Sequence, residues 1–170
     1  PDETVVLTVT AGTGYTVGTP SVGTGTIQDD EGVSPNLALG RPATASTSYS
    51  GLPASNATDG SLGSRWSSQF ADNEWIYVDL GSVYTVGRVV LRWEVAYGRG
   101  YKIQVSDTAS TWSDAYSTAA GDGGVDDVTL VSPASGRYVR MLGTQRATMY
   151  GYSLWEFEVY GGGATNHAPA

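Results

Sequence analysis

Hydrophobic and polar residues alternate in several stretches of this 170-residue chain. An alternation with a period of two over about six residues is typical of a strand that buries one face. No stretch shows the spacing of an amphipathic helix. The clearest alternations run through 75–80, 137–142 and 153–160, and the last would place Trp155, Phe157 and Val159 on one face.

Further apolar and β-branched stretches predict additional strands. Residues 83–95 and 101–106 are expected to pair through a turn at 97–100, which contains Gly98 and Gly100. Another strand is expected at 125–131. About six antiparallel strands at this spacing favour an all-β sandwich.

The first 33 residues differ from the rest of the chain. They contain only two short β-rich runs, 4–10 and 24–28. Two strands cannot enclose a core, and an isolated hairpin is marginally stable in water. These residues therefore predict either a detached hairpin or a flexible leader. The expected organisation is a hairpin segment in 1–33, a sandwich in 34–162 and, because of its small residues, a linker tail in 163–170.

The composition supports an all-β chain and excludes several kinds of chemistry. Glycine occurs 23 times and tyrosine 11 times, which is typical of strands joined by tight turns. The absence of cysteine excludes disulfides, thiolate zinc sites and thiol nucleophiles. His167 is the only histidine and lies in the tail, so no Ser–His pair is expected in the sandwich. No apolar run approaches the roughly 18 residues of a membrane-spanning helix.

The charge of the chain is distributed unevenly. The formal net charge is −8, which disfavours nucleic acid as a partner because phosphate binding needs clustered cations. Residues 1–33 hold 5 acids and no base, whereas 34–162 hold 12 acids and 9 bases, a net charge of −3. The nearly balanced sandwich suits a neutral polymer.

Several motifs in 36–161 occur in an order that resembles a known family. Together they resemble the discoidin domain (coagulation factor type C), in the form used as a family 32 carbohydrate-binding module. That resemblance implies a discoidin-like β-sandwich (jelly roll). The motifs are NLALGRPATAS (36–46), ATDGS (57–61), SRWSS (64–68), WIYVDLG (75–81), GRYVR (136–140) and LWEFEVYG (154–161).

The same resemblance implies a function. Such modules bind a polysaccharide or oligosaccharide without transforming it, and they are covalently linked to secreted or cell-surface bacterial enzymes that degrade polysaccharides. We expect a monomer with no catalytic residues. The alternative is a cell-surface adhesion module that binds protein or a glycoconjugate, because discoidin folds also serve that purpose.

A second resemblance concerns the N-terminal segment. The sequence ETVVLTVTAGTGYTVGTPSVGTGTIQDDE (3–31) is similar to the last two strands of a Calx-beta domain, whose repeats end in GTI followed by acidic residues. It implies that 1–33 is the C-terminal part of such a domain.

Asp59 lies in a glycine-containing turn with Ser61 and Ser64 close behind. Calcium prefers six or more oxygen ligands, several of which can be main-chain carbonyls. From the spacing alone, Asp59 either contributes to such a site or caps an Asx-turn. The family resemblance implies a structural Ca²⁺ held by the carbonyls near Ala57 and Ser61, by Asp59 and Ser64, and by Glu156 of the last strand.

Glu156 and Glu158 are the one pair of residues whose spacing could indicate catalysis. Two residues apart on a strand, they would lie about 6.5–7 Å apart, which is within the range of glycosidase carboxylate pairs. Such pairs are also common on exposed strand faces, either solvated or bound to a cation. We favour that interpretation, and therefore a protein that is not an enzyme.

Sugar-binding side chains are expected in the loops. Sugars stack their C–H faces on aromatic rings and bond their hydroxyls to charged or planar polar groups. The resemblance implies that Arg65, Phe70, Glu94 and Tyr150 line a shallow site at one end of the sandwich, although Arg65 could instead pin a loop. Further candidates are Tyr97, Arg146 and Tyr152 in the same loops and Tyr49 in the loop 48–50.

Two further expectations concern the ligand and the tryptophans. The loop 48–50 carries Tyr49 and lacks the acid that glucosamine-binding relatives have there, which favours a neutral β-glucan over an amino sugar. Trp66, Trp75 and Trp155 are expected to pack in the core.

Overall fold

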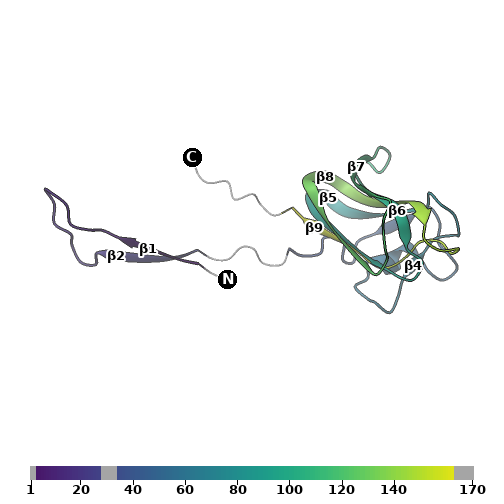
Figure 1. Cartoon of the computed structure of the whole chain (residues 1–170), viewed down its shortest axis with the longest axis horizontal. Coiled ribbons are helices and arrows are strands. Elements are labelled where there is room, and N and C mark those ends of the chain that lie inside the picture. The colour runs from purple at the N-terminus through teal and green to yellow at the C-terminus, as the bar shows by residue number, and fades with distance from the viewer. Residues whose placement is uncertain (1–2, 28–33, 163–170) are drawn as a thin grey trace. The chain divides into compact units, whose positions relative to one another are not determined.

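A computed structural model of the chain describes residues 3–27 and 34–162, which belong to two compact units. The N-terminal unit is a hairpin in which β1 (Glu3–Thr8) pairs antiparallel with β2 (Val22–Ile27) (Figure 1). Its apolar side chains, such as Val6 and Leu7, are exposed, so the two strands alone enclose no core. The predicted linker tail and its His167 lie outside the described residues.

The second unit is a sandwich of antiparallel strands, as expected for a discoidin-like fold. One short 3₁₀ helix, η1 (Ala54–Ala57), interrupts the strands. The hydrogen-bonded order is β4-β9-β5-β8-β6-β7, with β3 pairing β5. The strands are β3 (Ala43–Ala45), β4 (Trp66–Ser67), β5 (Trp75–Trp93), β6 (Gly98–Ser106), β7 (Ser113–Thr118), β8 (Val125–Arg146) and β9 (Ser153–Gly161).

The long strands β5 and β8 belong to both layers of the sandwich. The first part of β5 pairs with β3 and with the last part of β8, which continues to β6 and β7. The last part of β5 pairs with β9 and with the first part of β8. Register shifts between Asp79 and Tyr84 and between Val86 and Arg88 mark where β5 bends from one layer to the other.

The core lies between the two layers. Alternate residues of β5 face it, as the sequence pattern predicts: Ile76, Val78 and Leu80 are fully buried. The opposite layer contributes Leu154 and Phe157 of β9. At one end of the sandwich, four loops between strands carry the candidate site.

Two expectations about the strands need correction. The segments 83–95 and 101–106 do not pair with each other, because the chain between them crosses from one layer to the other and both pair with β8. In β9 a register shift opposite Arg92 and Trp93 interrupts the alternation, so Leu154 enters the core and Trp155 is only half-buried.

The tryptophans behave differently from one another. Trp66 is fully buried in the core, as expected. Trp75 lies on the outer face of β5, where it is half-buried and stacks on Tyr77 with ring centroids 5.5 Å apart. Tyr77 in turn contacts Trp112 and Tyr138. These rings cover one another and pack on the sheet rather than in the core.

Candidate functional site

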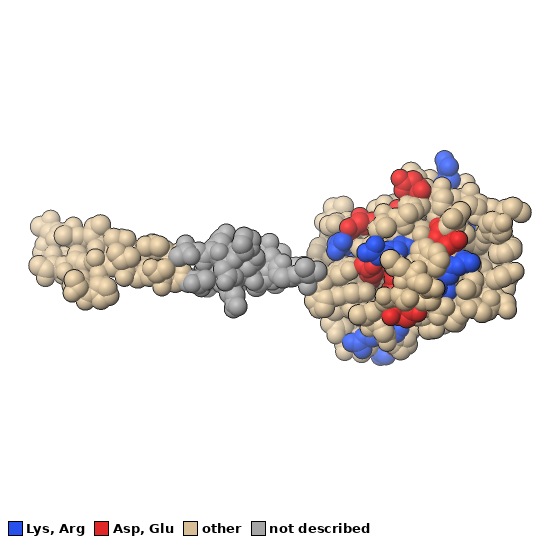
Figure 2. All heavy atoms as spheres, turned by 90° about the horizontal axis from the view of Figure 1, so that it is seen from below, with Lys and Arg blue, Asp and Glu red and all other residues tan. Residues whose placement is uncertain are grey.

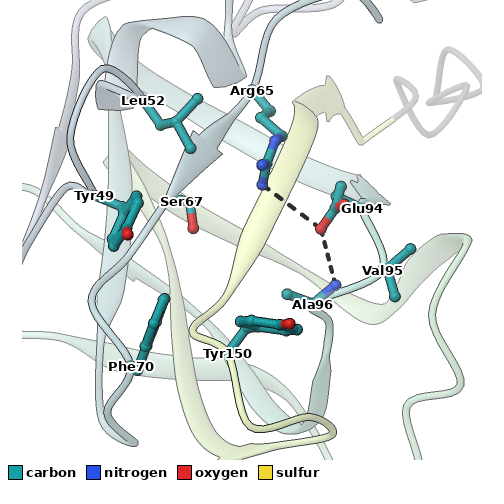
Figure 3. A pocket seen from close by; sticks show the side chains of 9 residues that line it. All are labelled: Tyr49, Leu52, Arg65, Ser67, Phe70, Glu94, Val95, Ala96 and Tyr150. Carbon is teal, nitrogen blue, oxygen red and sulfur yellow. Dashed lines mark hydrogen bonds and ion pairs between the residues drawn. The ribbon is translucent and has the colours of Figure 1, made fainter.

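A shallow pocket of about 480 Å³ lies among the loops at one end of the sandwich. Its walls come from the loop after β3, from the residues around β4, from the β5–β6 loop and from the β8–β9 loop. Figure 3 shows these side chains around one hollow. The lining residues are Tyr49, Leu52, Arg65, Ser67, Phe70, Glu94, Val95, Ala96 and Tyr150.

One wall of the pocket is aromatic. Tyr49 and Phe70 stack with centroids 5.2 Å apart and planes 12° apart. Phe70 meets Tyr150 edge to face at 5.7 Å. All three rings are partly exposed, and Figure 3 shows Tyr150 beneath the hollow with Tyr49 and Phe70 at its side. Rings exposed in this way offer apolar surface to a ligand with C–H faces.

The opposite wall is polar. The Arg65 guanidinium lies near the Glu94 carboxylate, with Nη1 and Oε2 3.6 Å apart. Arg65 Nη1 donates to the hydroxyl of Ser153 at 2.8 Å, and Glu94 Oε2 accepts from the amide of Ala96 at 3.1 Å. The pair therefore offers a donor and an acceptor beside the rings (Figure 3), and its charges balance.

Three of the predicted sugar contacts do not line the pocket. Arg146 instead braces the β8–β9 loop: its Nε donates to Asp72 at 3.1 Å, and its Nη1 donates to the carbonyls of Met149 and Tyr150 at 3.2 Å. This fixes the backbone that carries the Tyr150 ring. Arg146 therefore lies beside the predicted loop, but its side chain supports the loop backbone and does not face the pocket.

Tyr97 and Tyr152 also lie elsewhere. The ring of Tyr97 is half-buried against the core and beside Gly123. Tyr152 is fully buried, and its hydroxyl donates to Asp72 at 3.4 Å. Both tyrosines therefore support the loops instead of facing the pocket, because their rings find apolar neighbours in the sandwich.

Four lining residues were not predicted from the sequence. Leu52, Ser67, Val95 and Ala96 border the pocket, although none has a charged or aromatic side chain that would have singled it out. The only available signal was their position beside Tyr49, Arg65 and Glu94 in the candidate loops.

A second loop brings the predicted cation ligands together. Asp59 accepts from the amide of Ser61 at 2.8 Å and from the hydroxyl of Ser64 at 2.6 Å. Glu156 of β9 accepts from the amides of Gly60 and Ser61 at 2.9 and 3.0 Å. Ala57 is buried at the end of η1, two residues before Asp59.

The two carboxyl groups of this loop affect each other. Burial, together with the neighbouring Asp59 carboxyl, raises the pKa of Glu156 to about 7. The hydrogen bond from Ser64 lowers the pKa of Asp59. Within the described residues neither carboxyl forms an ion pair. All the atoms that could bind a metal here are oxygens, which are the ligands that hard cations such as Ca²⁺ prefer. Residues 3–27 and 34–162 contain no group of three or more His, Cys, Asp or Glu that could hold a metal ion, so carbonyls and hydroxyls would have to complete the shell.

Glu156 and Glu158 are engaged separately. Glu158 pairs with Arg92 and accepts from the hydroxyl of Tyr160 at 2.5 Å, whereas Glu156 is bound to the Asp59 loop. Neither residue lines the pocket. The two carboxylates are therefore held by different partners.

Most charges of the sandwich are paired on its surface. Six of the nine bases form ion pairs, and Figure 2 shows acidic and basic side chains interspersed on the visible face. Such a surface favours a ligand without strong charge. The described residues contain no helix that could cross a membrane.

Comparison with known proteins decides the family. The family model of F5/F8 type C domains, described as NedA-like galactose-binding domains, matches residues 56–141. The chain belongs to this family. As a discoidin-like carbohydrate-binding module it is non-catalytic, which agrees with the separate engagement of Glu156 and Glu158.

Solved structures of such modules share the fold. Chitosan-binding module 1 from a chitosanase/glucanase of Paenibacillus sp. IK-5 is 53% identical (TM-score 0.72; 75% of this chain, 99% of that chain). Module 2 of the same enzyme, solved with chitotriose, is 47% identical (TM-score 0.71; 74% and 100%). The family 32 module of C. perfringens NanJ, 19% identical, shares the fold alone (TM-score 0.67; 75% and 98%).

A curated relative is a much longer protein. The polysaccharide lyase 8 family protein HylA of Enterococcus faecalis (strain ATCC 700802 / V583) is 31% identical over 111 residues. The match covers 61% of this chain and 8% of the lyase.

Proposed function

We propose that the pocket binds one or two sugar units of a neutral β-glucan. The observation that carries this proposal is the aromatic wall of Tyr49, Phe70 and Tyr150 facing the Arg65–Glu94 pair. The Tyr150 ring would stack on the C–H face of a sugar, while Arg65 donates to one hydroxyl and Glu94 accepts from another. A site this shallow and open to water would bind in the micromolar to millimolar range.

The charge balance of the pocket supports a neutral ligand. Glu94 is the only carboxylate among the lining residues, and Arg65 lies 3.6 Å from it. An ammonium group at Glu94 would face the guanidinium, and like charges disfavour each other. The family resemblance implies that a glucosamine-binding module would carry an acid in the loop 48–50, where this chain has Tyr49.

Chitosan is the second candidate. The modules from the Paenibacillus enzyme are named for chitosan and are 53% and 47% identical to this chain. Binding to chito-oligosaccharides in preference to cello- and laminari-oligosaccharides would establish this candidate over the neutral glucan.

Affinity electrophoresis against soluble β-glucans and chitosan, with the variant Tyr150→Ala, tests the site. We expect glycan-dependent retardation of the native protein and its loss in the variant. Tyr15→Ala is the matched control, because Tyr15 of the hairpin is 55% exposed and Tyr150 is 52% exposed. Full binding by Tyr150→Ala would overturn the site. An absence of binding to every glycan would instead favour an adhesion module for protein.

We also propose that the Asp59 loop holds a structural Ca²⁺. Asp59 and Glu156 would supply charge, Ser64 a side-chain oxygen, and Ala57 and Ser61 their carbonyls. The raised pKa of Glu156 supports this assignment, because a bound cation would stabilise the ionised carboxylate that burial and Asp59 disfavour.

The wider role follows from the relatives. We propose that the module keeps a covalently linked, secreted polysaccharide-degrading enzyme of a bacterium near its substrate, which raises the effective concentration. The chitosanase/glucanase and the lyase that carry similar modules support this role.

We also propose that residues 1–33 are the C-terminal part of a Calx-beta domain. A protein that contains the remaining strands of such a domain should then fold as one unit with this segment.

A further inference from the structure

Ser153, the first residue of β9, is fully buried and makes four hydrogen bonds besides its pairing with β4. Its amide donates to the carbonyl of Ala96 at 2.8 Å, and its carbonyl accepts from the amide of Glu94 at 3.0 Å. Its hydroxyl accepts from Arg65 Nη1 at 2.8 Å and donates to the carbonyl of Trp66 at 3.0 Å. Ser153 thus holds the Arg65 guanidinium through its hydroxyl and the backbone of Glu94 and Ala96 through its main chain.

The directions of the two bonds at the Ser153 hydroxyl determine what it offers to Arg65. A serine hydroxyl has a single proton, and the Trp66 carbonyl can only accept it. The hydroxyl oxygen therefore presents a lone pair to Arg65. Glu94 Oε2 is occupied in a similar way by the amide of Ala96 at 3.1 Å.

Arg65 and Glu94 consequently stop short of each other. Their closest approach, 3.6 Å, exceeds the length of a charge-assisted hydrogen bond, which is about 2.7–2.9 Å. A guanidinium and a carboxylate free to move would join in a two-pronged pair and use up the donors and acceptors that face the pocket. The separation is maintained because each group is bound to a third partner.

We propose that Ser153 is a positioning residue that keeps Arg65 and Glu94 apart, so that their remaining donor and acceptor atoms are free for sugar hydroxyls. This inference rests on the proposed function of the pocket. The serine would not touch the sugar; it acts by giving Arg65 Nη1 a partner other than Glu94.

The variant Ser153→Ala removes the hydroxyl and leaves both main-chain bonds of residue 153 in place. The nearest partner left for Arg65 Nη1 is then Glu94. We expect the ion pair to close and glycan affinity to fall about tenfold. Ser106→Ala is the matched control, because Ser106 is buried, makes two hydrogen bonds through its hydroxyl and does not line the pocket.

A second measurement separates positioning from a merely structural role. A double-mutant cycle of Arg65→Ala and Glu94→Ala, followed by urea unfolding of the full chain, gives the coupling between the two side chains. We expect the coupling free energy between Arg65 and Glu94 to be small in the native background. In the Ser153→Ala background it should be clearly more favourable. A crystal structure of Ser153→Ala should show the two groups within hydrogen-bond distance.

The outcomes are distinguishable. Unchanged coupling, or unchanged glycan affinity in a Ser153→Ala protein whose site still depends on Tyr150, would overturn the positioning role. Binding that survives Tyr150→Ala would overturn the proposed site instead, and the coupling measurement, which needs no glycan, would still report on Ser153.

Discussion

The two loop sites of the sandwich handle charge in opposite ways. In the pocket, Glu94 lies beside Arg65, and the charges cancel within the protein. In the Asp59 loop, Asp59 and Glu156 lie together with no cation from the described residues paired to them, and the pKa of Glu156 rises to about 7. The first site balances its charges within the protein, whereas the second holds two acids with no paired cation among the described residues. This difference is the basis for proposing a neutral ligand for the pocket and Ca²⁺ for the Asp59 loop.

The largest expected effect is that of calcium on the stability of the fold. At a Ca²⁺ concentration 100-fold above its dissociation constant, binding should stabilise the fold by about 3 kcal/mol. Thermal unfolding with calcium and with excess EDTA measures the effect, and Asp59→Asn should remove most of it. Equal melting temperatures in both buffers would contradict the calcium proposal.

Removing the cation of the pocket should weaken sugar binding. Arg65→Ala removes a donor and leaves Glu94 without its cation, so neutral β-glucan binding should weaken by about 2 kcal/mol. Binding of chito-oligosaccharides should weaken less or improve, because the ammonium no longer meets a guanidinium. Titration calorimetry with both sugars measures the ratio, and an equal loss for both would count against the neutral-ligand assignment.

The pH dependence of stability tests the Asp59 loop without calcium. The pKa of Glu156 is raised in the folded state from 4.5 to about 7, so the folded protein binds more protons than the unfolded chain between these values. The contribution is therefore present in full below about pH 4.5 and is lost as the pH rises through 7. Each unit by which the folded-state pKa is raised corresponds to about 1.4 kcal/mol in the free energy of unfolding.

Glu156→Gln should flatten that profile. Urea unfolding in EDTA from pH 4.5 to 8 compares the variant with the native protein, with Glu94→Gln as the control from the pocket. A native profile that rises over this interval would refute the predicted sign.

The smallest effect is expected at the aromatic wall. Phe70→Tyr keeps the ring that stacks on Tyr49 and adds a hydroxyl at the partly exposed end. We expect glycan affinity to change by less than about 0.5 kcal/mol, since surface substitutions that leave the packing intact have small effects. A tenfold change in the binding isotherm would mean that the hydroxyl contacts the sugar.

The sequence predicted the layers of the fold better than the route of the chain between them. The alternation in 75–80 identified the buried Ile76, Val78 and Leu80 because a period of two follows directly from strand geometry. It could not reveal the bulge in β9, since the register shift near Trp93 depends on a partner strand distant in sequence. For the same reason the pairing of 83–95 and 101–106 was wrong.

At the candidate site, motif and loop position located Arg65, Phe70, Glu94 and Tyr150 in one pocket. They did not separate side chains that face the pocket from those that support it. Arg146 and Tyr152 lie at the two ends of the loop that carries Tyr150, but their roles depend on Asp72, which is 74 and 80 residues away in the chain. Ser153 carried no signal at all, because a buried serine is visible only through its partners.

The sharing of β5 and β8 between the two layers has a consequence for how the sandwich comes apart. Neither layer can lose its pairing without withdrawing a strand from the other, because the two strands are paired along both halves of their length. The sandwich should therefore unfold in a single cooperative step, and the amides of β5 and β8 should exchange their hydrogens only when the whole unit opens.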